Sequence, residues 1–143
     1  MGLKEQMGQM IRGELPPPPI VETMGLRLAK YGEGEARVEI EVDERYHNPH
    51  GTLHGGIPAL LADMAMGVAV ISLLEEDETF TTLELKINYI RPVIAGTLVA
   101  DGKVVHKGAR TIVVESTVTN SDGKMVARAT STCLLFKNDR VSR

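Results

Sequence analysis

The sequence has no tryptophan, and only three tyrosines and two phenylalanines among its 143 residues. Its core must therefore be packed mainly from Val, Ile, Leu, Met and Ala, and an apolar fraction of 43% is enough for one sizeable core without cross-links. Cysteine is nearly absent too, because Cys133 stands alone and cannot form an internal disulfide. Its place in a strand-like run favours a small core residue in a reducing compartment over a nucleophile.

Positive charge is also in short supply. The formal net charge of −3 argues against a general nucleic-acid binder. The first thirteen residues mix charged and apolar side chains, so they do not form the unbroken hydrophobic region of a secretory signal. The one apolar run of membrane length, Ile57 to Leu74, contains Pro58 and Asp63 and precedes strand patterns. We therefore expect a soluble, cytoplasmic protein without a membrane or nucleic-acid partner.

That apolar run predicts a long helix, because a helix that is apolar all round is a buried helix. Pro58 suits its first turn, and Gly55 with Gly56 leaves the backbone open to another group. The free amides at such a helix start attract an anion or a developing oxyanion. Burial of Asp63, the only charge in the run, is costly unless it is paired, hydrogen-bonded or protonated, so this carboxylate is a candidate functional group.

Most of the remaining chain shows strand patterns. Ala36 to Asp43 alternates apolar and charged residues, which predicts one buried and one wet face. In the segment 80–90 the alternation predicts Leu83, Leu85, Ile87 and Tyr89 inward. Repeated helical crossovers are missing, so an α+β fold is expected in which a curved antiparallel sheet wraps the long helix. The predicted strands are 26–31, 36–43, 80–90, 97–106, 111–120 and 125–136.

The first 23 residues read as a separate segment. Leu3 to Ile11 has apolar residues at helical spacing, and Pro16 to Pro19 predicts a stiff extended connector rather than a recognition motif. The chain thus divides into an N-terminal helix and Pro-rich connector (1–23), a main domain (24–137) and a C-terminal tail (138–143).

The order of elements resembles a known family. The residues that carry the likeness are Asn48, the run Gly51-Thr52-Leu53-His54-Gly55-Gly56, then Leu61-Ala62-Asp63, and finally Asn88-Tyr89-Ile90-Arg91-Pro92. Together they resemble the hotdog-fold acyl-CoA thioesterases of the phenylacetate-pathway type, over roughly Met24 to Lys137. The resemblance implies hydrolysis of acyl-CoA to free acid and coenzyme A, without a metal or a redox cofactor. It also implies homodimers, often paired into tetramers.

The same resemblance assigns roles at the thioester. Attack on a thioester carbonyl creates an oxyanion, which a backbone N–H at a helix start stabilises, and Gly55 matches that donor. Asp63 matches the carboxylate that either attacks the carbonyl or deprotonates water, and the sequence leaves both roles open. The alternative is that Asp63 is a hydrogen-bonded helix carboxylate with only a structural role.

Three further residues match family positions around the thioester. Asn48 and His54 would line the site, and Thr82 falls where the family keeps a Ser or Thr that positions the nucleophile or the water. Simpler interpretations stay open, since Thr82 suits an ordinary strand position and Asn48 suits a turn before Pro49. The acyl group is also open, because Ala59, Ala62, Met64, Met66 and Val70 suit an aromatic or an aliphatic pocket.

The coenzyme A end has candidates of its own. From Ile87 to Val114 the only acidic residue is Asp101, whereas cations recur. Arg91, Lys107 and Arg110 are therefore candidates for the phosphates of coenzyme A, although solvation of strand ends explains them almost as well.

Other functions must be weighed. His47, His50 and His54, with Asp63, could be considered a metal site, but Pro49 and Gly51 interrupt any regular element that would bring the imidazoles together. A hotdog dehydratase or hydratase would pair a carboxylate with a histidine, and a non-catalytic acyl-CoA-binding protein would not need Asp63.

Helix geometry predicts that the site is shared between two chains. Gly55 and Asp63 are eight residues apart, about 12 Å along a helix at 1.5 Å per residue. Reacting atoms must approach to about 3–3.5 Å. A second helix, antiparallel across a two-fold axis, would bring its own Asp63 to the first chain's Gly55.

Overall fold

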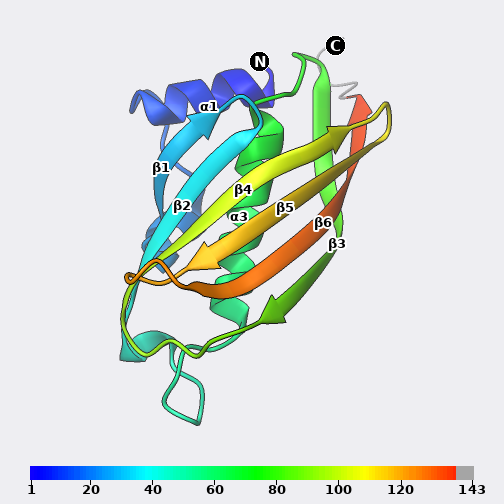
Figure 1. Cartoon of the computed structure of the whole chain (residues 1–143). Helices are drawn as coiled ribbons and strands as arrows, with labels where there is room; N and C mark the ends of the chain where they lie inside the picture. Colours follow the sequence, from blue (N-terminus) through cyan, green and yellow to red (C-terminus); the bar gives the residue numbers. More distant parts are fainter. Residues whose placement is uncertain (138–143) are drawn as a thin grey trace.

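A computed structural model describes residues 1–137, and it shows one long helix lying along the concave face of a curved antiparallel sheet (Figure 1). The six strands follow the order β1-β2-β4-β5-β6-β3. This confirms the predicted α+β architecture; the predicted tail, 138–143, lies outside the described residues. The elements are α1 (Leu3–Ile11), α2 (Pro19–Met24), β1 (Arg27–Gly32), β2 (Glu35–Val42), a 3-10 turn (Glu44–Tyr46), α3 (Gly56–Ile71), β3 (Glu78–Tyr89), β4 (Gly96–Lys107), β5 (Thr111–Thr119) and β6 (Met125–Lys137).

The core lies between α3 and the sheet. The side of α3 that carries Leu61, Ala65 and Ala69 is buried, whereas Asp63 and Met64 are half-buried on its outer side. Removal of this apolar surface from water is the main favourable term for such a packing. Within residues 1–137, none of the helices has both the length and the apolar character that a membrane crossing requires.

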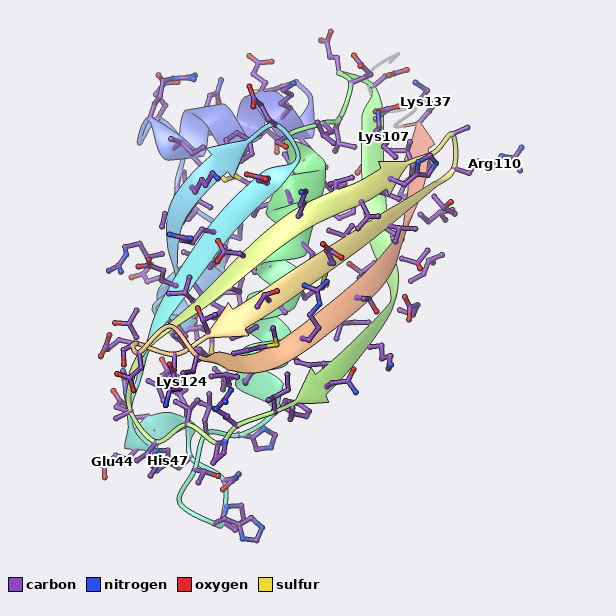
Figure 2. All side chains as sticks on the ribbon, viewed as in Figure 1. Glu44, His47, Lys107, Arg110, Lys124 and Lys137 are labelled. Atoms are coloured by element: carbon purple, nitrogen blue, oxygen red, sulfur yellow. The ribbon has the colours of Figure 1, made fainter. Side chains whose placement is uncertain are left out.

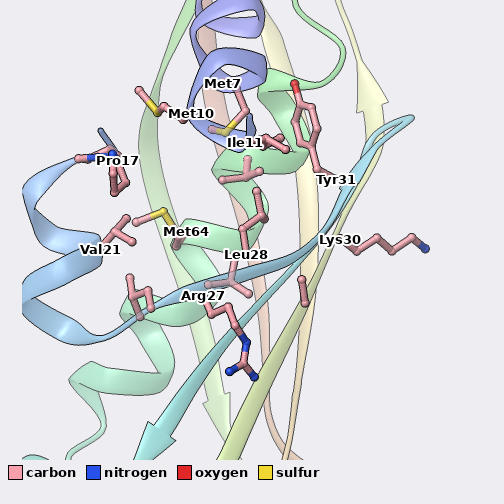
Figure 3. A pocket seen from close by; sticks show the side chains of 15 residues that line it. Met7, Met10, Ile11, Pro17, Val21, Arg27, Leu28, Lys30, Tyr31 and Met64 are labelled. Carbon is pink, nitrogen blue, oxygen red and sulfur yellow. The ribbon is translucent and has the colours of Figure 1, made fainter. Parts of the chain in front are cut away.

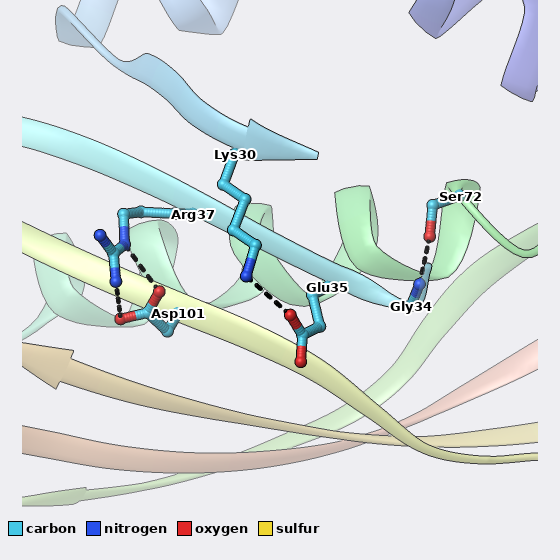
Figure 4. A network of polar contacts seen from close by, with 6 residues as sticks. All are labelled: Lys30, Gly34, Glu35, Arg37, Ser72 and Asp101. Carbon is cyan, nitrogen blue, oxygen red and sulfur yellow. Dashed lines mark hydrogen bonds and ion pairs between the residues drawn. The ribbon is translucent and has the colours of Figure 1, made fainter. Parts of the chain in front are cut away.

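The helix ends at Ile71, three residues before the expected Leu74, and the buried Ser72 caps it. The Ser72 hydroxyl donates to the Ala69 carbonyl at 2.7 Å and accepts from the Gly34 amide at 2.8 Å (Figure 4). These bonds tie the helix end to the turn between β1 and β2. The nearby pairs Lys30–Glu35 and Arg37–Asp101 lie on the outer surface, where ion pairs contribute little stability.

Two inward predictions in β3, those for Leu83 and Tyr89, are wrong. The register with β6 shifts between Thr82 and Glu84, so one extra residue enters the strand and Leu83 turns outward with 57% of its surface exposed. Leu85 and Ile87, beyond the bulge, pack against the core as predicted. Tyr89 is also 56% exposed, because it ends the strand and reaches over the start of α3.

The N-terminal segment contains an unpredicted second helix. Only part of the proline run is a connector, since Pro19 occupies the first turn of α2, where a missing N–H costs nothing. Gly25 ends this short helix with φ = 67°, a left-handed conformation that favours glycine. As a result α1 and α2 lie beside β1 and α3 (Figure 1).

Sheet and helix approach each other closely at Gly102 in β4. A Cβ built there would meet the Ala65 carbonyl and would lie 2.8 Å from the Met66 amide nitrogen. Both are backbone atoms of α3, which cannot move aside as a flexible side chain can. Glycine at this position therefore sets how closely the helix packs on the sheet.

We expect Gly102→Ala to lower the free energy of unfolding by about 1–3 kcal/mol or more, because overpacking displaces α3. Chemical denaturation at equilibrium measures the change. Gly8→Ala in α1 is the matched control, since its Cβ would meet only the flexible end of Arg12, and alanine there should be neutral or stabilising. Equal stability of Gly102→Ala and the wild type would contradict this packing.

Candidate functional site

Asp63 and Thr82 are in direct contact. The Thr82 hydroxyl in β3 donates to Asp63 Oδ1 at 3.2 Å, across the half-buried space between strand and helix. Thr82 faces the helix because it is the last inward residue before the bulge at Leu83. The bond fixes one carboxylate oxygen and leaves Oδ2 without a hydrogen bond from the described residues.

Cys133 lies behind this pair. Its sulfur is 4.0 Å from the Thr82 hydroxyl and 4.0 Å from the Ser131 hydroxyl, and its side chain is buried. Burial raises the pKa of the Cys133 thiol, so the sulfur stays protonated and weakly nucleophilic. The prediction of a small core residue is confirmed.

The start of α3 presents a free backbone amide. The Gly56 N–H donates to His54 Nδ1 at 2.9 Å, whereas the Gly55 N–H has no acceptor within residues 1–137. The Gly55 carbonyl accepts from the Tyr89 hydroxyl at 2.6 Å, and the Tyr89 ring covers the glycine so closely that a Cβ would lie 3.0 Å from it. Tyr89 therefore holds the helix start in place while the Gly55 amide remains available.

The same contacts define the protonation of His54. Because Nδ1 accepts the Gly56 amide, the proton of the neutral imidazole is on Nε2. The ring is exposed, so Nε2–H can donate to a group above the helix start.

Asn48 organises the loop before the helix. Its Oδ1 accepts from the His50 amide at 2.9 Å and the Thr52 amide at 3.3 Å, and its Nδ2 donates to the Thr52 hydroxyl at 3.1 Å. These are the bonds of a turn residue. Asn48 also lines a cavity of about 350 Å³ with Gly55, Tyr89 and Arg91, so the structure supports both interpretations of this residue.

This cavity contains the Gly55 side of the site but not Asp63, which sits two turns further along α3. Sequence reasoning did not give Tyr89 a role. The available signal was the tyrosine of Asn88-Tyr89-Ile90-Arg91-Pro92, which looked like an inward strand residue and proved to contact the helix start.

The candidate cations do not gather at one place. Lys107 donates to the buried carboxylate of Glu78 at 2.8 Å, so its charge is already compensated. Burial by itself raises the pKa of Glu78, but the Glu75 amide and Lys107 together outweigh it and hold the pKa below its usual range. Arg110 is exposed in the β4–β5 turn beside Lys107 (Figure 2).

Arg91 lies at the other end of β3, where its Nη1 donates to the Met125 carbonyl at 2.7 Å. The strand that separates it from Glu78 and Lys107 has 12 residues and spans more than about 30 Å. Arg91 and Arg110 of one chain therefore lie near opposite ends of β3.

Two histidines of the alternative metal site make other contacts. His47 Nε2 contacts the Ile94 carbonyl at 2.7 Å, and His54 Nδ1 accepts from the Gly56 amide. Among the residues that the structure describes, no three His, Cys, Asp or Glu side chains lie together as metal ligands would.

Comparison with known proteins agrees with this geometry. A family model described as the thioesterase superfamily matches residues 50–127, and the chain belongs to that superfamily and has the hotdog fold. The 1,4-dihydroxy-2-naphthoyl-CoA hydrolase of Listeria monocytogenes is 32% identical over 116 residues, which cover 81% of this chain and 94% of that relative.

Similar solved structures include proteins whose names refer to phenylacetic acid degradation. The PaaI protein of the E. coli phenylacetic acid degradation operon is similar with a TM-score of 0.82 at 26% identity, over 96% of this chain and 98% of that one. A phenylacetic acid degradation-related protein of Ralstonia eutropha has a TM-score of 0.82 at 29% identity, over 89% and 97% of the two chains. The family resemblance drawn from the sequence is thereby confirmed.

The contact between Thr82 and Asp63 generates a prediction. Thr82→Val removes the hydroxyl at nearly constant shape and should lower kcat for thioester hydrolysis about tenfold or more, because the carboxylate loses the bond that orients it. Thr82→Ser keeps the hydroxyl and should retain most of the activity. Steady-state kinetics of both variants gives kcat and KM separately. If Thr82→Val and Thr82→Ser lose activity equally, or neither loses any, the hydroxyl does not position Asp63.

Proposed function

We propose that this protein hydrolyses acyl-CoA thioesters, with Asp63 as the reacting carboxylate and the Gly55 N–H as the oxyanion donor. The observation that carries the proposal is that α3 has both an oriented carboxylate, Asp63, and a free backbone amide at its start, Gly55. The relative from Listeria monocytogenes, which bears the name of a CoA thioester hydrolase, supports the substrate class.

The chemistry divides between the start of α3, at Gly55, and its middle, at Asp63. The amide and the dipole at the helix start stabilise negative charge that develops on the carbonyl oxygen during attack. His54 Nε2–H, on the same side, can donate to the leaving sulfur or to the carbonyl. Asp63 attacks the carbonyl carbon or removes a proton from water, and the bond from Thr82 serves both routes because it leaves Oδ2 free.

In this proposal the Gly55 amide and the Asp63 carboxylate of one site belong to different chains. Gly55 begins α3 and Asp63 lies about 12 Å further along its axis, so one carbonyl does not reach both. In this proposal the second chain attaches along β3, an edge strand whose outer backbone groups have no partner strand in the described residues. Along this strand, Tyr89 is hydrogen-bonded to Gly55 and Thr82 is hydrogen-bonded to Asp63.

A two-fold axis that crosses β3 near Leu85 would set Tyr89 opposite the partner's Thr82. The two α3 helices would then run antiparallel on one face of a continuous sheet, and each Gly55 amide would face the partner's Asp63. An isologous contact of this kind creates two equal sites. We therefore propose a homodimer as the unit that forms the site.

Coenzyme A would extend away from the thioester toward a cationic group. Arg110 is the better candidate of the β4–β5 turn, since Lys107 is engaged by Glu78. Arg91 belongs beside the Gly55 cavity and could contact the same nucleotide only from the partner chain. The proposal needs neither a metal nor a redox cofactor.

The direct test is thiol release from a panel of aromatic and straight-chain acyl-CoA esters. We expect Asp63→Asn to lower turnover on the order of 10³-fold or more, because an amide neither attacks the carbonyl nor removes a proton. The protein should stay folded, since loss of a half-buried charge does not require new packing. Binding without hydrolysis across the panel would favour a non-catalytic acyl-CoA-binding protein, and near-normal turnover of Asp63→Asn would remove Asp63 from the mechanism.

Complementation tests the shared site. Gly55→Pro deletes the amide N–H, and the φ of −58° at this position suits proline. Gly55→Ala is its control, because it adds the same Cβ against Tyr89 but keeps the N–H. We expect inactive Asp63→Asn and Gly55→Pro chains, unfolded and refolded together, to recover activity in mixed dimers that hold one intact site. A mixture that stays inactive although mixed dimers form would mean that both groups act within one chain.

A further inference from the structure

The N-terminal segment encloses a second cavity, which the mechanism above does not use. It has a volume of about 580 Å³ and lies between α1, α2, β1 and the outer side of α3 (Figure 3). The volume is within the range of small-molecule sites. Its wall includes Met7 and Met10 of α1, Val21 of α2, Leu28 of β1 and Met64 of α3.

The wall is apolar and holds no free charge. Of its 15 residues only Arg27, Lys30 and Tyr31 carry polar side chains. Arg27 is paired with Glu39, and Lys30 turns away from the cavity in Figure 3 and donates to Glu35 at 2.8 Å. A ligand that brings its own charge would therefore find no free counter-ion inside. The cavity suits an uncharged tail whose polar head stays outside.

Of the helix α3, the cavity wall includes Met64, the residue after Asp63, but not Asp63 itself. Met64 follows Asp63 directly, both are half-buried on the outer side of α3, and the Met64 side chain extends toward Val21 (Figure 3). From Met64 the wall continues along the helix to Val68, about 6 Å further along the axis. A chain that leaves a thioester held at Asp63 can thus pass over Met64 into the cavity.

The side chains of the wall favour a flexible occupant. Met7, Met10 and Met64 are unbranched and adapt their shape to what they contact. Ala62, Met66 and Val70, which also suited an acyl pocket by sequence, are instead buried against the sheet. An alkyl chain, which is itself flexible, can fill the irregular space between these methionines.

We propose that α1, α2 and β1 form the binding chamber for the aliphatic chain of the substrate, so that the protein acts on long straight-chain acyl thioesters in preference to short ones. This inference rests on the proposed function. It also gives residues 1–23 a role, since α1 and α2 supply one wall. The Tyr31 hydroxyl, buried without a hydrogen-bond partner among the described residues, provides a polar point in that wall.

Two neighbouring residues of α2 allow a matched test. Val21 lines the chamber, whereas Ile20 is exposed and is not part of the wall. Val21→Trp should lower kcat/KM for dodecanoyl-CoA about tenfold or more and leave butanoyl-CoA within about twofold, because a bulky side chain fills the space for the long chain only. Met10→Trp, on the half-buried face of α1, should act alike. Ile20→Trp should leave both substrates unchanged.

The outcomes separate the chamber from the reaction. Equal effects of Val21→Trp on both chain lengths, or no effect in a folded variant, would overturn the chamber. If the wild type hydrolyses no acyl-CoA, the proposed function fails. The chamber can then still be tested by calorimetry, which compares the effect of Val21→Trp on the affinity for the non-hydrolysable S-dodecyl-CoA and S-butyl-CoA.

A wild-type experiment removes any dependence on the folding of the tryptophan variants. S-dodecyl-CoA with a diazirine at the chain end should, on irradiation, label peptides that contain Met7, Met10 or Val21. Labelling confined to other parts of the chain would place the acyl tail elsewhere and overturn the proposal.

Discussion

The structure depends on the burial of one apolar helix against one curved sheet. Helix α3 has so little polar surface that it is stable only when covered, and the strands cover its inner side. Gly102 permits the close contact, since any side chain there would strike the backbone at Ala65. The depth of this contact determines where the outer side of the helix stands, and hence where Asp63 meets Thr82.

The candidate site lies on the side of α3 that the sheet does not cover. On one flank of α3 the edge strand β3 supplies Thr82 and Tyr89, which fix the carboxylate and the helix start. On the other flank β1 and the N-terminal helices enclose an apolar chamber. A helix that is buried on its inner side thus presents polar chemistry to one neighbour and apolar surface to the other, and both meet at Asp63 and Met64.

Electrostatics explains why the state of the candidate cations was harder to predict than the start of α3. The number of Lys and Arg residues can be read from a sequence, but not which of them are already paired with a carboxylate. Lys107 looked free beside Arg110, yet Glu78 reaches it from the start of β3 and is itself held by the Glu75 amide. A buried carboxylate requires such a partner, so the pairing is a consequence of burial that only the packed structure reveals.

The sequence by itself determined the buried helix, the residues around the start of that helix, and the antiparallel strands. Apolar periodicity, glycine, proline and a lone carboxylate are local signals, so they can be read without the structure. It did not determine the bulge at Leu83, the helix in the proline run, or the hydrogen bond from Tyr89 to Gly55. These depend on contacts between residues far apart in the chain, and a single extra residue in a strand reverses every side chain beyond it. The chamber beside Met64 likewise exists only because α1 and α2 fold back onto α3, a contact that no local pattern encodes.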